Sequence, residues 1–246
     1  MGYRYRTSAL CSAATRRAVL LASAGLAVAG SFPFRASARQ QTDPDLLVRG
    51  AVTLSGGQPV AWRVVSDVAE VAPDAAFERR ALGFAVNTSI FTPLLVTDEA
   101  TGTAFRLLPG EAAFTPDGVV QRRESLGGGA ESYLRIALVP GAQANDAGGD
   151  RLRFAGPSFA APAGIVTLAL VRAQLGVGDA VSLPASSGDA LVIVEQGEAV
   201  LETAVGSEPL ATTVGSDTAY AVRSVAGAAR LVGQRSGTSV LLAVVA

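Results

Sequence analysis

Short runs in which hydrophobic and polar residues alternate make up most of the chain after residue 58, and none has the length and spacing of an amphipathic helix. Alternation with a period of two is typical of strands that bury one face. Clusters of turn-forming residues, such as Ser-Gly-Gly at 55–57 and Pro-Asp-Gly at 116–118, separate the runs. The pattern predicts strands at residues 59–66, 77–86, 93–98, 103–108, 111–116, 119–125 and 132–140.

A second series of strand-like runs follows residues 141–164, which are rich in Gly, Ala and Pro and which we interpret as a linker. The two series are similar: the run that begins at Gly110 has a counterpart 105 residues later, at Gly215. A repeat of that length indicates a duplicated domain. We therefore predict an all-β chain with one barrel or sandwich at residues 45–140 and another at residues 165–246. Two unrelated β domains are the alternative.

The first 38 residues have the order of an export signal. A basic region ends at Arg16-Arg17, an apolar run of 13 residues follows at 18–30, and Ala36-Ser37-Ala38 offers a small-x-small cleavage site. The arginine pair before Leu20 and Leu21 resembles a twin-arginine signal, and ordinary Sec signals also carry arginines. An uncleaved anchor is the alternative, but spanning a bilayer takes about 20 apolar residues. We expect a signal peptide at residues 1–38, and an exported protein (extracellular, periplasmic or in the cell envelope) without a membrane span after cleavage.

The absence of histidine restricts the possible chemistry more than any other feature of the composition. Histidine is the usual general base and the commonest metal ligand, and a Ser-His-Asp triad is impossible without it. The single cysteine, Cys11, lies in the predicted signal peptide, so the remainder has no thiol, disulfide or Cys/His zinc site. All 20 basic residues are arginines, which excludes a lysine base or Schiff base.

The charge of the exported part argues against nucleic acid as a partner. Five of the 20 arginines and none of the 21 acidic residues precede Arg39, so the remainder carries 15 arginines against 21 acids. A net charge of −6 gives an acidic surface, which repels phosphate backbones and anionic membranes.

The spacing of glycine and proline around Gln121 resembles the second sequence motif of the cupin family. Gly110, Pro116 and Gly118 stand at the motif's turn positions, Gln121 stands at its histidine position and Ser125 at its asparagine position. The other cupin motif is matched in the second half from Gly178 to Gly197. There Pro184 and Ser186 replace the two histidines, and Ala190 replaces the glutamate, beside Asp189.

The resemblance covers most of residues 45–246 and implies two cupin-like barrels, each a double-stranded β-helix or jelly roll. Metal-binding cupins hold their metal with three imidazoles and a carboxylate. Amide oxygens and hydroxyls are weak substitutes for imidazole. We therefore expect no catalytic metal and no other cofactor in this double-cupin chain.

Period-two alternation predicts that Gln121, Arg123 and Ser125 point into the first barrel, whereas Arg122 and Glu124 face outward. A buried arginine needs a partner. We favour an internal salt bridge, for which Glu78 is a candidate partner, or an arginine at the mouth of the barrel; a small acidic or polyhydroxy ligand is the alternative.

The remaining candidates are isolated residues. Trp62, the only tryptophan, suits core packing better than a ligand platform. Asp146 and Asp150 lie in a loop that lacks full calcium-loop spacing. Asp189 and Glu195 are acids near the altered motif, and no spacing fixes them as a catalytic pair.

The sequence thus predicts an exported binding protein rather than an enzyme. Its ligand-binding candidates are Gln121, Arg123, Ser125, Glu78 and Trp62, and its ligand is a small polar or acidic molecule or a protein partner. A divergent enzyme that uses carboxylates with Gln121 and Arg123 is one alternative, and a structural or assembly protein is another. We also expect a homodimer or a tight pairing of the two halves.

Overall fold

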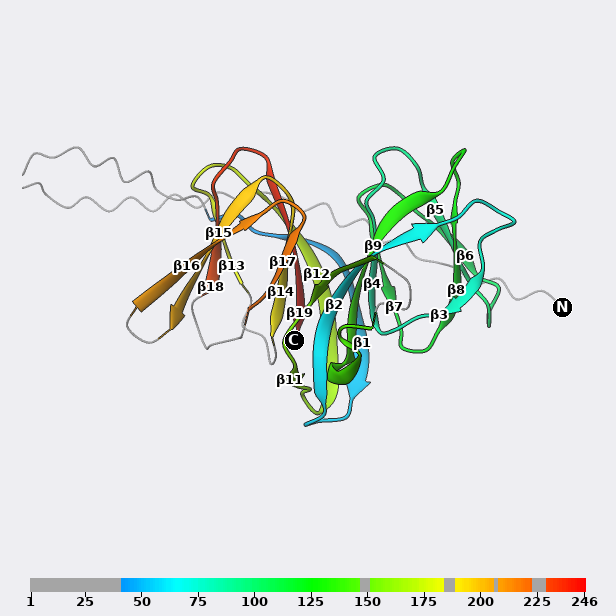
Figure 1. Cartoon of the computed structure of the whole chain (residues 1–246), viewed down its shortest axis with the longest axis horizontal. Coiled ribbons are helices and arrows are strands. Elements are labelled where there is room, and N and C mark those ends of the chain that lie inside the picture. Colours follow the sequence, from blue (N-terminus) through cyan, green and yellow to red (C-terminus); the bar gives the residue numbers. More distant parts are fainter. Residues whose placement is uncertain (1–40, 147–150, 184–188, 206–207, 223–228) are drawn as a thin grey trace, which may run out of the picture. The chain divides into compact units, whose positions relative to one another are not determined.

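The computed structural model describes residues 41–146, 151–183, 189–205, 208–222 and 229–246 (Figure 1). Nearly all regular structure in these residues is β-strand, which confirms the predicted all-β class; the exception is the short 3₁₀ helix η1 (Gly141–Gln143). Among them, no helix is long and apolar enough to cross a membrane. The predicted signal peptide lies outside the described residues, as do Asp150, Pro184 and Ser186.

The first barrel, barrel 1, consists of two sheets. Its inner sheet contains β10 (Arg151–Ala155), β2 (Pro59–Ala69), β9 (Glu131–Pro140), β4 (Gly83–Asn87) and β7 (Ala112–Thr115) in spatial order, with β11 (Phe159–Ala160) also paired to β2. Its outer sheet contains β3 (Phe77–Arg79), β8 (Val120–Ser125), β5 (Leu94–Asp98) and β6 (Ala104–Leu107).

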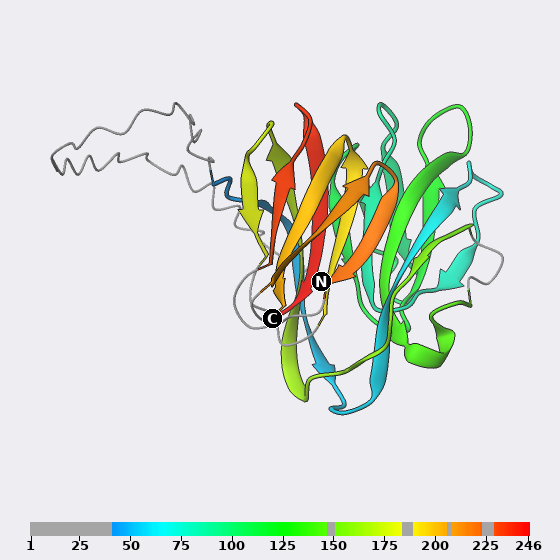
Figure 2. The same ribbon diagram turned by 60° about the vertical axis from the view of Figure 1, so that its left-hand side comes forward.

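The second barrel, barrel 2, has the same two-sheet construction. Its inner sheet contains β1 (Asp45–Leu54), β12 (Gly164–Leu175), β19 (Thr238–Val245), β14 (Ala190–Gln196) and β17 (Thr218–Val222). Its outer sheet contains β13 (Ala180–Ser182), β18 (Ala229–Gly233), β15 (Glu198–Val205) and β16 (Glu208–Gly215). Figures 1 and 2 show the two inner sheets side by side, between the two outer sheets.

The two barrels exchange strands. β1 precedes barrel 1 in the chain, yet it pairs with β12 along nine register positions, from Asp45↔Arg172 to Leu54↔Gly164. In the other direction, β10 and β11 lie within the predicted linker at residues 141–164 and extend the inner sheet of barrel 1 beside β2. Local sequence patterns do not reveal this exchange, because a strand's alternation does not say which neighbour it pairs with.

The largest hydrophobic core lies between the two inner sheets. Trp62, Val64, Phe84 and Ile136 from barrel 1 belong to the same buried cluster as Leu168, Leu170, Leu191 and Leu241 from barrel 2. A second, smaller core fills barrel 2 and a third lies in barrel 1. The inner strands therefore bury both faces, which accounts for their long apolar runs. The expected tight pairing of the two halves is present within this chain.

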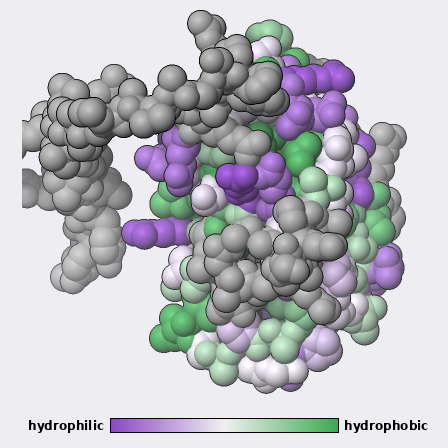
Figure 3. Space-filling model, turned by 90° about the vertical axis from the view of Figure 1, so that its left-hand side faces the viewer, coloured by the Kyte–Doolittle hydropathy of each residue, from purple (hydrophilic) through white to green (hydrophobic). Residues whose placement is uncertain are grey.

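Two motif glycines adopt the backbone conformation for which glycine is favoured. Gly110, at φ 79°, and Gly118, at φ 70°, both occupy the left-handed region in the turns on either side of β7. On the face shown in Figure 3, hydrophilic and hydrophobic side chains are interspersed.

Candidate functional site

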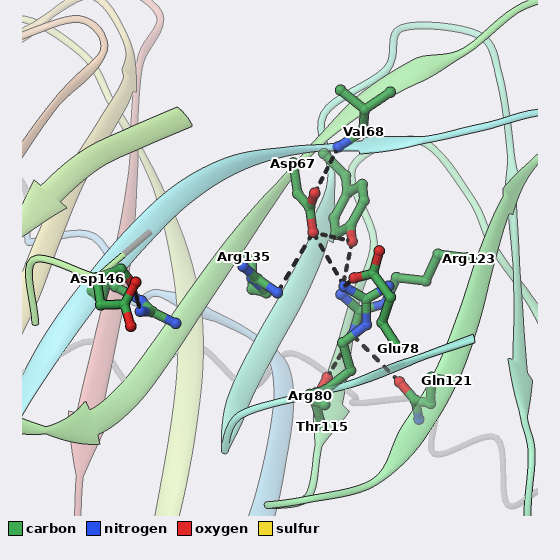
Figure 4. Close-up of polar contacts among 11 residues, drawn as sticks. Asp67, Val68, Glu78, Arg80, Thr115, Gln121, Arg123, Arg135 and Asp146 are labelled. Atoms are coloured by element: carbon green, nitrogen blue, oxygen red, sulfur yellow. Dashed lines mark hydrogen bonds and ion pairs between the residues drawn. The ribbon is translucent and has the colours of Figure 1, made fainter. Parts of the chain in front are cut away.

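The interiors of the two barrels differ in polarity. The described core of barrel 2 is filled by Leu, Val and Ala side chains, among them Leu175, Val192 and Leu201. Barrel 1 instead holds a cluster of charged and polar side chains, which we call the arginine network (Figure 4). Its members are Asp67, Arg80, Thr115, Gln121, Arg123, Tyr133 and Arg135.

Period-two alternation delivers these side chains to the interior of barrel 1. Trp62 and Val64 of β2 face barrel 2, so Asp67, three positions after Val64, faces the other way. The same alternation in β9 turns Ile136 towards barrel 2 and directs Tyr133 and Arg135 into barrel 1. Small residues on the inward face of the same sheet, Ala69, Ala85 and Ala113, leave room for the long polar side chains.

Asp67 joins the members of the network. Its Oδ2 atom accepts a hydrogen bond of 2.6 Å from the Tyr133 hydroxyl. The same oxygen lies 3.3 Å from Nη1 of Arg80 and 3.7 Å from Nη1 of Arg135. Charge-assisted bonds of this kind, held away from water, fix all four side chains in one arrangement.

Arg123 lies in the same interior, but its described partners are neutral. It donates to the Thr115 hydroxyl over 2.9 Å, to the Tyr133 hydroxyl over 3.2 Å and to the Gln121 amide oxygen over 3.3 Å. Its guanidinium carbon also lies 5.1 Å from the centre of the Tyr133 ring, a cation–π distance. Arg123 is only 3% exposed and forms no ion pair with any carboxylate of the described residues.

The pKa of Arg123 reflects both its burial and the positive charges nearby. Burial lowers the pKa of the Arg123 guanidinium; Tyr133 partly opposes the shift, and the neighbouring charges of Arg80 and Arg135 add to it. Burial also raises the pKa of the Tyr133 hydroxyl, which stays protonated and can donate to Asp67. The interior is therefore an environment in which one more negative charge would be stabilised.

The predicted inward residues of β8 are buried as expected: Gln121, Arg123 and Ser125 are each no more than 6% exposed. Ser125 takes no part in the arginine network, because its hydroxyl donates to the Gly129 carbonyl over 2.6 Å and holds the turn after β8. The prediction for Glu124 was wrong with respect to exposure. It is 6% exposed and forms an ion pair of 3.1 Å with Arg122, and the end of β2 packs beside it through the Glu70↔Glu124 bridge.

The proposed pairing of Glu78 with Arg123 was also wrong. Glu78 lies opposite Gln121 in the β3–β8 register, two residues short of Arg123. Its carboxylate instead lies 2.6 Å from Nη1 of Arg80. Glu78 is more than half exposed, so it approaches the buried Arg80 from the solvent side.

Trp62 is a core residue. Its side chain is 1% exposed in the cluster between the barrels, and Nε1 donates to the Asp189 carbonyl oxygen over 2.7 Å. No face of the indole is open to a ligand, so the structure supports the packing interpretation.

The candidate acid Glu195 forms a bidentate ion pair with Arg172, at 2.7 and 2.8 Å.

Sequence reasoning missed five members of the network: Asp67, Arg80, Thr115, Tyr133 and Arg135. Alternation opposite the apolar face of β2 and β9 would have placed three of them in barrel 1. Their convergence depends on the pairing register of Asp67 with Tyr133, which joins residues 66 positions apart in the chain.

The candidate Asp146 lies beside Arg63, near the network. Arg63 donates hydrogen bonds to the backbone carbonyl oxygens of Gln143 and Asp146.

The donors present do not fit the metal of metal-binding cupins. Gln121 occupies the histidine position, and its amide oxygen already accepts from a guanidinium. The one carboxylate in the network, Asp67, is held by Tyr133 and two arginines. In the part of the chain that the structure describes, no three His, Cys, Asp or Glu side chains gather closely enough to hold a metal ion. A divalent cation would also meet repulsion from three guanidinium groups.

Comparison with solved structures bears on the fold. An oxalate decarboxylase from Lactobacillus farciminis, solved as a formate complex, matches 89% of this chain and 87% of its own with a TM-score of 0.51 at 10% identity. The chain has a cupin fold. Other cupin-fold matches are YhaK from Escherichia coli (TM-score 0.48, 13% identity, 80% of this chain and 93% of that one) and hazelnut (Corylus avellana) vicilin (0.40, 7%, 80% and 73%).

These likenesses concern the cupin fold alone, because the sequence identities are low. No protein-family model matches the sequence, and no curated protein matches it. A fold does not specify a function, so the function of this cupin-fold chain has to follow from its own side chains.

Proposed function

We propose that this protein is an exported, non-catalytic cupin-fold protein that binds a small acidic ligand inside barrel 1. The observation that carries the proposal is the isolation of Arg123, a buried guanidinium whose described partners are all neutral. A buried charge without a counter-charge is costly. A carboxylate or similar oxyanion supplies that counter-charge and matches the planar donor fork of arginine.

The balance of charge in the barrel supports an acidic ligand over a neutral one. Arg80 and Arg135 both lie against the Asp67 carboxylate, whereas the third guanidinium, that of Arg123, has only neutral described partners. Glu78 adds a second carboxylate, but from an exposed position on the three-residue strand β3. We infer that Glu78 occupies the position on Arg80 that a ligand carboxylate takes, so the two compete.

The test is calorimetric titration of the full exported chain with a series of small carboxylates, from formate to citrate, and with sulfate, all at one ionic strength. We expect saturable binding of at least one of these anions. Arg123→Met should abolish that binding, because it removes the cation and keeps much of the side-chain volume. Glu78→Gln should tighten it, because it removes the competing carboxylate.

Arg106→Met is the matched control, since Arg106 is an exposed arginine on β6 outside the arginine network. It should bind like the wild type. If no anion binds the wild type, or if Arg123→Met binds anions as well as the control does, the proposal is wrong and the network is an internal structural one.

A further inference from the structure

A cleft of about 430 Å³ opens between the two inner sheets, at one end of the core that joins the barrels. Its walls come from strands of both barrels: Ser66 and Ser132 from barrel 1 face Arg172 and Glu195 from barrel 2. This volume lies within the range of protein sites for small molecules, about 300–1,000 Å³. The cleft is separate from the arginine network, because it lies on the opposite face of the inner sheet of barrel 1.

The strands that line the cleft change from apolar to polar at the same end. On the surfaces that the two inner sheets turn towards each other, four strands carry apolar core residues at every second position. In each strand, the next position of the series, two residues beyond the last apolar one, holds a polar residue that lines the cleft. These series are Trp62-Val64-Ser66 in β2, Ile136-Leu134-Ser132 in β9, Leu168-Leu170-Arg172 in β12 and Leu191-Ile193-Glu195 in β14. The cleft therefore has an apolar floor, which includes Val64, Leu134 and Ile193, and a polar rim.

One wall of the cleft is held rigidly. Arg172 binds both carboxylate oxygens of Glu195 and donates to the Gly110 carbonyl oxygen over 2.6 Å. Glu195 in turn accepts from the Ser239 hydroxyl over 2.8 Å. Such a network keeps its planar polar groups in place before any ligand arrives, which lowers the entropic cost of binding.

The cleft is electrically balanced, unlike the interior of barrel 1. Arg153 and Asp217 add one exposed charge of each sign to the Arg172–Glu195 pair. The hydroxyls of Ser66 and Ser132 make no hydrogen bond with the described residues, so both can donate and accept. Balanced charges, free hydroxyls and an apolar floor suit a neutral molecule with many hydroxyl groups and an apolar face.

We propose that this inter-barrel cleft binds a neutral polyhydroxylated ligand the size of a mono- or disaccharide. The rim residues hydrogen-bond the ligand's hydroxyls, and the floor covers its C–H face. The inference stands independently of the acidic ligand proposed for barrel 1.

Saturation-transfer-difference NMR and calorimetry on the full exported chain test the cleft, with glucose, galactose, mannose, maltose and cellobiose as probes and glucuronate as a charged counterpart. We expect saturable binding of at least one neutral sugar, and weaker binding of glucuronate than of glucose. Ser132→Leu places an apolar side chain at an exposed rim position and should weaken sugar binding at least about tenfold. Asp217→Asn removes one rim charge while keeping a residue that tolerates the observed φ of 60°, and should also weaken binding.

Thr213→Val on β16 is the control for an exposed strand hydroxyl remote from the cleft, and should leave sugar binding unchanged. The proposal is overturned if none of the neutral sugars binds the wild type. It is also overturned if Ser132→Leu and Asp217→Asn, both shown to be folded by circular dichroism, bind sugar as well as Thr213→Val does. Arg123→Met should bind sugar normally, which separates this site from the one in barrel 1.

Discussion

The hydroxyl of Tyr133 donates a 2.6 Å hydrogen bond to Asp67 Oδ2, and this contact joins two residues that lie opposite each other on the paired strands β2 and β9. Asp67 is the one carboxylate among the members of the arginine network, and Tyr133 connects it to Arg123. The charge state of the barrel interior therefore depends on this pair.

Removal of the Asp67 charge should destabilise the fold. Asp67→Asn removes the carboxylate that Arg80 and Arg135 share and leaves the buried Arg80 with Glu78, which reaches it from the solvent side; breaking a buried ion pair costs about 3 kcal/mol of unfolding free energy. Urea unfolding followed by circular dichroism measures the loss. Sulfate at matched ionic strength should restore more stability to Asp67→Asn than to the wild type.

The matched control for Asp67 is Glu99→Gln, an exposed acid at the β5–β6 turn, which should change stability by less than about 0.5 kcal/mol. Equal losses for the two variants would show that Asp67 does not balance the arginines.

The raised pKa of Tyr133 predicts a loss of stability in alkaline solution. The folded state holds the phenolic proton more tightly than the unfolded state, because burial disfavours the phenolate. This contribution is complete below the unfolded pKa of about 10 and is lost as the pH rises through the folded pKa. Urea unfolding between about pH 8 and 11 should show a steeper decline for the wild type than for Tyr133→Phe.

At neutral pH, Tyr133→Phe should itself cost about 1–3 kcal/mol, because the variant leaves Asp67 short of a donor. Tyr220→Phe serves as the control, since Tyr220 is 39% exposed. An alkaline decline that Tyr133→Phe leaves intact would contradict the assignment to Tyr133.

The shared core predicts that the two barrels unfold together. Trp62 is buried between them and is the only tryptophan, so its fluorescence reports the interface directly. Circular dichroism reports the strands of both barrels. We expect the two signals to give coincident urea transitions with one midpoint, as in two-state unfolding. Separate midpoints would mean that one barrel stays folded after the interface opens.

The left-handed glycine of the cupin-like turn gives a fourth prediction. Gly118→Ala forces a Cβ atom into φ 70° and should cost about 1–2 kcal/mol of unfolding free energy. Gly129→Ala is the control, because a Cβ there meets nothing within 4 Å and its φ lies outside the left-handed region. Thermal or urea unfolding of both variants measures the difference, and equal stabilities would contradict the backbone argument.

Much of the architecture followed from local patterns. Alternation predicted the strands and the burial of Gln121 and Arg123, because one face of a strand in a two-sheet barrel must be covered. Local patterns did not reveal that Glu124 is buried or that Glu78 binds Arg80. Both outcomes depend on which strands lie alongside β8, and alternation alone does not specify a neighbour.

By itself, the sequence determined an all-β chain, the turn positions of Gly110 and Gly118, and the lack of imidazole donors at the metal positions of the cupin motifs. Each of these follows from residue type or from spacing within one strand or turn. The tertiary structure alone decided that β1 crosses to barrel 2 and that Asp67 meets Tyr133, Arg80 and Arg135. It also decided that a polar cleft opens between the barrels. These features join residues far apart in the chain, and strand pairing and sheet packing fix them only when the whole core assembles.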